Sequence, residues 1–193
     1  MNKIHQFTRN LTAPHIFALI LLVLLYVLRP SYIGNVWFLL AGITFLTVLP
    51  ILAYPMQKFI PRYKDRGREG QRKLAVIFSF VGYLLGTVTV FLLGAPVELK
   101  MVFTEYLLCG ICIFIADKVF KYKASGHACG STGPMAMLVY MGLYIPAAIC
   151  AAFIVPVCVS SIKTKRHTPL QLVVGSIIPI AMLVIVHFTF KVL

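Results

Sequence analysis

Two histidines in separate polar stretches are the side chains best suited to chemistry in this sequence. His127 lies in the glycine-rich stretch 121–134, and His167 lies in the basic stretch 160–169. Near neutral pH an imidazole can attack an electrophile when neutral and donate a proton when charged. Lysines at positions 118, 121 and 123 precede His127, and the small residues around it let a ligand approach the backbone closely.

The glycine-rich stretch also resembles an anion-binding site. Gly133 and Pro134 are typical of the start of a helix, because proline is favoured at the first helical position. Backbone N–H groups at such a start, together with nearby lysines, suit an anion such as phosphate. The alternative interpretation is a solvated basic loop between two membrane helices, and this stretch taken alone favours that alternative.

The composition predicts a membrane protein. Of the 193 residues, 60% are hydrophobic and 12% are charged. Several segments approach or exceed about 18 uninterrupted apolar residues, the length typical of a membrane helix. We therefore expect a single domain, residues 1–193, with an all-α fold: a polytopic membrane helical bundle of six or seven transmembrane helices.

The route of the chain between the two histidines decides whether they meet. We expect helices at 16–28, 33–54, 74–94, 97–119 and 170–190. A single helix over 134–160 would place the histidines on opposite sides of an apolar core roughly 30 Å thick. A hairpin broken between Gly142 and Pro146 would return both to one side, and proline suits the first turn of a new helix. We favour the hairpin.

The charges predict the orientation of this bundle. The net charge of +13 lies almost wholly in the connecting loops, and the stretch 58–73 alone holds seven cations and two acids. This stretch either orients the protein or clamps phosphate, because arginine binds phosphate oxygens in a bidentate manner. With the hairpin, the basic stretches share the side of the histidines, which the positive-inside rule assigns to the cytoplasm. We expect a multi-pass protein of the cell membrane, the inner membrane of a bacterium.

Other polar side chains have simpler interpretations. Glu105 lies within an expected membrane helix, which makes it a functional candidate, although pairing with a lysine or tyrosine is the favoured role. His187 is expected to be an isolated interfacial side chain. Cys109 and Cys112 have redox spacing, but the cysteines are expected to pack as small hydrophobic residues. We expect no metal site.

Two histidine motifs carry a resemblance to a known family. Ser125-Gly126-His127, followed about forty residues later by His167-Thr-Pro-x-Gln171 and then Gly175, resembles the type 2 phosphatidic acid phosphatase superfamily. Its small bacterial members have a Lys-x-Ser-x-His motif and a His-Thr-x-x-Gln motif. The cluster 65–72 is similar in place to the family's first basic motif, without its Lys-x6-Arg-Pro spacing. The resemblance covers roughly residues 58–180.

The resemblance implies a mechanism without metal or cofactor. His167 would attack phosphorus and form a phosphohistidine, and His127 would protonate the leaving alcohol. The residues that would bind the substrate are Lys64, Arg66, Arg72, Lys123, Ser125, Gly126, Arg166 and Gln171.

Two positions depart from the common family pattern. The arginine six residues before the nucleophile is replaced by Ser161, and the aspartate four residues after it is replaced by Gln171. Glutamine can hold a ring tautomer by hydrogen bonding but cannot compensate the charge of an imidazolium. The small bacterial members also carry this glutamine.

The resemblance thus implies an integral membrane phosphatase that hydrolyses a phosphomonoester or diphosphate on a lipid, such as phosphatidate, phosphatidylglycerol phosphate or a polyprenyl diphosphate. The alternative is a non-catalytic lipid-phosphate binder, flippase or transporter of the same fold. A third interpretation is a structural membrane subunit whose basic face docks an acidic partner. The expected partners are the bilayer and the lipid phosphate, with no nucleic acid; a homo-oligomer is left open.

Overall fold

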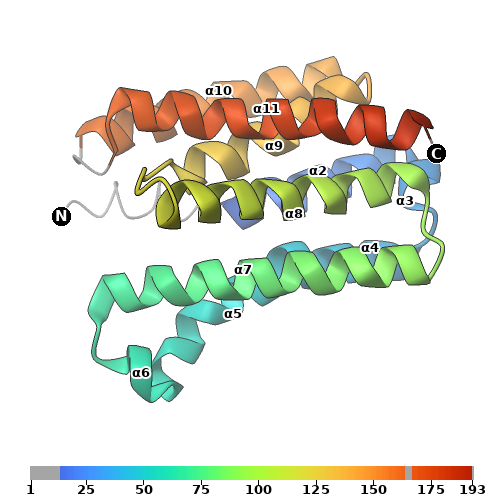
Figure 1. Cartoon of the computed structure of the whole chain (residues 1–193). Helices are drawn as coiled ribbons and strands as arrows, with labels where there is room; N and C mark the ends of the chain where they lie inside the picture. Colours follow the sequence, from blue (N-terminus) through green and yellow to red (C-terminus); the bar gives the residue numbers. More distant parts are fainter. Residues whose placement is uncertain (1–13, 164–166, 193) are drawn as a thin grey trace.

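The computed structural model describes residues 14–163 and 167–192, and every regular element in these two ranges is a helix (Figure 1). In chain order the elements are α2 (Pro14–Leu28), α3 (Pro30–Ile33), α4 (Val36–Ile43), η1 (Thr44–Val48), α5 (Leu49–Met56), η2 (Gln57–Phe59), α6 (Pro61–Lys64), α7 (Gly67–Leu92), α8 (Val97–Lys118), α9 (Gly126–Tyr140), α10 (Tyr144–Lys163) and α11 (Pro169–Val192).

Four helical stretches of the described residues are long and apolar enough to cross a membrane. They are Val36–Phe59, Glu69–Leu92, Val97–Lys118 and Pro169–Lys191. The apolar stretches Pro14–Leu28 and Tyr144–Val155 are shorter. The expected all-α bundle is therefore found, with four helices long and apolar enough to cross a membrane, whereas the expected count of six or seven crossings stays a prediction.

Helix α9 lies at the centre of the upper part of the bundle in Figure 1. It packs against α2, α8, α10 and α11, while α7 packs against α5, η1 and α8 on the other side. The side chains buried in α9 are mostly small. A Cβ added at Gly130 would overlap Pro14 of α2, and one added at Gly133 would lie 3.2 Å from Glu105 Oε1 of α8. Small residues thus let α9 approach its neighbours closely, as is common between membrane helices.

Two glycines one turn apart on α7 let it pack closely against two neighbours, η1 in its own half of the bundle and α8 in the other. A Cβ at Gly82 would overlap the carbonyl oxygen of Phe45, and a Cβ at Gly86 would overlap the ring of Phe103. This spacing of small residues allows helix backbones to come close together. The half formed by α4, η1, α5 and α7 is thereby packed onto α8.

The predicted hairpin between the histidines is confirmed. Helix α9 ends at Tyr140, Gly142 has a positive φ of 76°, and α10 runs back from Tyr144 (Figure 1). Glycine adopts positive φ without the steric cost that a Cβ would add. The starts of α9 and α11 therefore lie at the same end of the bundle.

The predicted start of α9 is wrong. The helix begins at Gly126, and Pro134 lies inside it instead of at its first position. Ser125 caps the helix, because its side-chain oxygen accepts the N–H of Ala128 at 3.3 Å. Glycine and proline are tolerated inside membrane helices when neighbouring helices cover them. The polar stretch predicted as a loop is thus mostly a buried helix.

Candidate functional site

Ser125 joins the two histidine motifs. Its backbone N–H donates to the carbonyl oxygen of Gln171 at 3.1 Å, and its side chain is fully buried. Gly175, one turn further along α11, faces the same segment: a Cβ there would lie 2.5 Å from the Ser125 carbonyl oxygen. The start of α9 therefore rests directly on the first turns of α11, and this contact brings the two motifs to one place.

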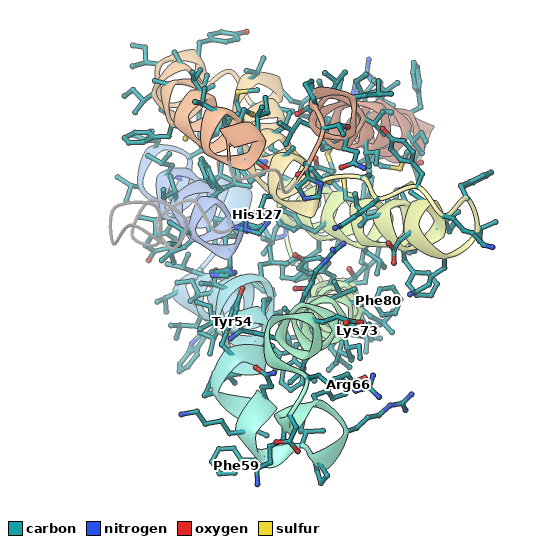
Figure 2. All side chains as sticks on the ribbon, turned by 90° about the vertical axis from the view of Figure 1, so that its left-hand side faces the viewer. Tyr54, Phe59, Arg66, Lys73, Phe80 and His127 are labelled. Carbon is teal, nitrogen blue, oxygen red and sulfur yellow. The ribbon has the colours of Figure 1, made fainter. Side chains whose placement is uncertain are left out.

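His127 is the second residue of α9, and its side chain is exposed at the end of the bundle. Figure 2, which views this end, shows it near the middle of the bundle. Its backbone carbonyl accepts the Ser131 hydroxyl at 2.9 Å, so the backbone around it is held by the helix. An exposed imidazole on a fixed helix start is well placed to meet a ligand at this end.

His167 lies just before α11 and is half-buried. Its Nδ1 is 3.2 Å from Gln171 Oε1, and the same oxygen accepts the Thr168 backbone N–H at 3.2 Å. The Gln171 N–H is in turn bound by the Thr168 hydroxyl at 3.3 Å. When Nδ1 donates its proton to this glutamine, the lone pair of the neutral ring is on Nε2, the nitrogen that can act as a nucleophile.

The bonds between Thr168 and Gln171 form a capping box. A threonine before the helix and a glutamine three residues later satisfy each other's backbone N–H groups, and Pro169 occupies the first helical position. The sequence analysis did not predict this helix cap, although the pattern Thr-Pro-x-Gln before an apolar run indicates it. The histidine motif is therefore also the start signal of α11.

The predicted cations do not all lie beside the histidines. Lys123 is exposed two residues before Ser125, and Arg166 lies outside the described residues. Lys64 ends α6, while Arg66 follows it, and α6 packs against η2 and α7. Figure 2 shows Arg66 well apart from His127, on the α6 side of the bundle.

The predicted residues thus fall into two groups. The contact between α9 and α11 brings together the chain segments that carry Ser125, Gly126, His127, His167 and Gln171. The exposed residues Lys64, Arg66 and Arg72 belong to α6 and the start of α7, at the same end of the bundle but on another side (Figure 1).

Glu105 is buried in the interior, with 1% of its surface exposed. Neither of its carboxyl oxygens has a hydrogen-bond partner among the described residues, and nor does the Tyr106 hydroxyl next to it. The expected pairing with a lysine or tyrosine is therefore not observed in the part of the chain that the structure describes. The carboxyl group faces Gly133 of α9 instead.

The remaining polar side chains have structural roles. His187 is not isolated, because its Nδ1 lies 2.8 Å from the Tyr140 hydroxyl and so links α11 to α9 at the far end. Cys109, Cys129 and Cys150 are buried thiols, in agreement with the expectation. Across residues 14–163 and 167–192, no group of three or more metal-binding side chains converges.

Comparisons with protein-family models, curated proteins and solved structures gave no match for this chain. The geometry of the site and the motifs of the sequence are therefore what supports a proposal about function.

Proposed function

We propose that this protein is an integral membrane phosphatase that removes phosphate from a lipid. The observation that supports the proposal best is the hydrogen bond between the Ser125 N–H and the Gln171 carbonyl oxygen. Because this bond joins the segment before His127 to the turn after His167, two imidazoles from separate motifs share one end of the bundle. A nucleophile and a general acid must share one end of the bundle in this way if they are to act on the same phosphate.

The proposed reaction has two steps. In the first, Nε2 of neutral His167 attacks phosphorus, the bond between phosphorus and the lipid oxygen breaks, and charged His127 gives that oxygen its proton. In the second, water attacks the phosphohistidine, His127 takes a proton from the water, and inorganic phosphate leaves. His167 and His127 then return to their starting states. A positioned acid or base of this kind contributes about 10²–10⁴-fold to the rate.

The surrounding residues have supporting roles in this proposal. Gln171 holds Nδ1 of His167 and so orients the ring. The exposed helix start at Gly126, with Lys123 and Arg166, binds the phosphoryl oxygens, while Ser125 holds this segment against α11. No metal or other cofactor is involved.

The bundle itself suits a lipid substrate. Its exposed surface carries many large apolar side chains, which can accept the acyl or prenyl tail, and the histidines lie at its end, where the head group would be. We propose phosphatidate, phosphatidylglycerol phosphate or a polyprenyl diphosphate as substrate. We also propose six or seven crossings in a cell membrane, with the histidine end in the cytoplasm.

The test is phosphate release from these lipids by the purified protein. The variants are His127→Ala and His167→Ala, with His187→Ala as a matched control at the opposite end of the bundle. We expect each of the first two to lower the rate at least about 100-fold, and the control to remain near wild type. Equal release by all four proteins would contradict the catalytic proposal.

Two observations favour a second function, that of a lipid-phosphate binder, flippase or transporter. The position of the family arginine is occupied by Ser161, and α6 carries Lys64 away from the histidines. Fewer cations are then available to neutralise a transition state than in the family pattern. Brief mixing with labelled substrate distinguishes the two: a phosphatase accumulates phosphate on His167, whereas a binder retains lipid phosphate without forming that bond.

A further inference from the structure

The end of the apolar stretch Val36–Phe59 and the residues that follow it fold into a compact basic turn, residues 57–66, which we call the basic elbow. Helix η2 ends at Phe59, Ile60 is extended, and α6 follows as a single turn. The Gln57 side chain stabilises this turn, because its Nε2 donates to the Tyr63 carbonyl at 3.1 Å and to the Gly67 carbonyl at 2.7 Å. Gly67 completes the turn with a positive φ of 51°.

The exposed side chains of the basic elbow are mainly cationic. Its four cations, Lys58, Arg62, Lys64 and Arg66, are all exposed, and its single acid is Asp65. The neighbouring acid, Glu69, is bound by Lys73 of the same helix at 2.6 Å. The basic elbow therefore presents an excess of positive charge to its surroundings.

An exposed aromatic side chain lies next to these cations. Phe59 is the last residue of the apolar stretch Val36–Phe59 and has 75% of its surface exposed. A phenyl ring at the end of a membrane span, followed by lysine and arginine, is suited to the boundary between acyl chains and head groups. The basic elbow thus combines an apolar contact with a cationic one.

The position of the basic elbow separates it from the histidines. It connects the apolar stretches Val36–Phe59 and Glu69–Leu92, so when both cross a membrane it lies at the surface from which they emerge. Helix α6 packs on η2 and α7, and Figure 1 shows it at the outer corner of the bundle. In Figure 2, Phe59 and Arg66 lie on this corner, away from His127.

We propose that the basic elbow is a binding site for the head groups of anionic phospholipids, distinct from the histidine site. Arginine binds phosphate oxygens in a bidentate manner, and lysine adds a mobile positive charge. Cations next to a membrane span are attracted to the anionic surface of the cytoplasmic leaflet. The two bonds from Gln57 hold the backbone that carries these cations in one conformation before lipid binds, which reduces the cost of ordering it.

The test measures lipid binding by native mass spectrometry of the full chain released from detergent. Phosphatidylglycerol is the anionic probe and phosphatidylcholine the zwitterionic one. The double variant Lys58→Gln with Arg62→Gln is compared with Arg29→Gln plus Lys191→Gln, which removes the same charge at the opposite end of the bundle. We expect the first to weaken phosphatidylglycerol binding about tenfold, the second less than about twofold, and phosphatidylcholine binding to be unchanged by both.

The same variants show whether phosphatidylglycerol binds at the basic elbow. A melting curve confirms that each variant is folded. Equal weakening by both double variants would mean that overall charge, and not the basic elbow, attracts the lipid, and no weakening by either would equally overturn the proposal. Loss of phosphate release by the Lys58 and Arg62 variant with phosphatidylglycerol binding intact would assign the basic elbow to the substrate instead. The proposal would also be overturned if the Lys58 and Arg62 variant lost an acidic protein partner while its phosphatidylglycerol binding stayed intact.

Discussion

The backbone N–H of Ser125 donates to the backbone carbonyl of Gln171 at 3.1 Å, and this bond joins two segments that are 46 positions apart in the chain. Main-chain atoms alone make the bond, so it does not depend on the side chains of His127 or His167. Replacing either histidine should therefore leave the contact between α9 and α11 in place. Loss of activity in such variants can then be attributed to the missing imidazole.

Gly175 is the position at which this contact is most sensitive. In Gly175→Ala the new Cβ would lie 2.5 Å from the Ser125 carbonyl oxygen, a backbone atom that cannot turn aside. We expect the variant to force α9 away from α11, to lose about 1–3 kcal/mol of stability as in other overpacked sites, and to lower phosphate release. Thermal unfolding in detergent and the lipid phosphatase assay measure these effects.

Gly110→Ala is the control for that variant. It also adds one methyl group inside a helix, but the nearest atom, Tyr83 Cδ2, would be at an ordinary contact distance of 3.4 Å. We expect its melting temperature to be equal to wild type or slightly higher, because alanine favours the helix over glycine. Equal melting temperatures for the two variants would contradict the importance of the Gly175 contact.

The hairpin could be predicted because its signals are local. Gly142 ends one helix by its positive φ, and Pro146 lies within the first turn of the next. The apolar helices were equally clear, since a long run without charges identifies a membrane span without any knowledge of its neighbours.

The start of α9 and the placement of the cations could not be predicted in the same way. Gly130 and Gly133 indicate a loop when considered locally, but in the structure they lie in a helix and leave room for its close approach to Pro14 and Glu105. The composition of residues 58–73 indicates a cationic surface, whereas only the packing of α6 on η2 and α7 determines which side of the bundle it occupies. The start of α9 and the placement of the cations both depend on contacts with residues far away in the sequence.

Gln171 should control the reactivity of His167. Gln171→Leu removes the oxygen that lies 3.2 Å from both His167 Nδ1 and the Thr168 N–H, so the ring loses its orientation and α11 loses part of its cap. We expect phosphate release to fall about 10–100-fold, the range seen when the hydrogen-bond partner of a metal-bound histidine is removed. Steady-state kinetics should show the loss mainly in kcat.

Gln171→Glu is the matched variant. Its carboxylate can accept the same two hydrogen bonds and adds a negative charge that stabilises an imidazolium. We expect it to retain most of the wild-type rate or exceed it. A glutamate variant as slow as the leucine variant would argue against an orienting role for Gln171.

The hydrogen bond between Tyr140 and His187 allows stability to be separated from activity. Tyr140→Phe removes a 2.8 Å bond that links α9 to α11 at the end opposite the proposed site. We expect a loss of about 1 kcal/mol in stability, the usual value for one such bond, with phosphate release unchanged at temperatures where the protein is folded. A large fall in rate would show that the far end of α9 affects the histidines.

Glu105 provides the last prediction. Its carboxyl group is buried against Gly133 and has no hydrogen-bond partner among the described residues, so a carboxamide of nearly the same shape removes no observed interaction. We expect Glu105→Gln to change stability by less than about 1 kcal/mol, whereas Glu105→Lys places a cation in the same apolar space and should prevent folding. Glu98→Gln, in the first turn of the same helix, is the control for loss of one carboxyl. Melting curves of the three variants give the comparison, and a loss of more than about 2 kcal/mol in Glu105→Gln alone would show that this carboxyl makes a stabilising interaction after all.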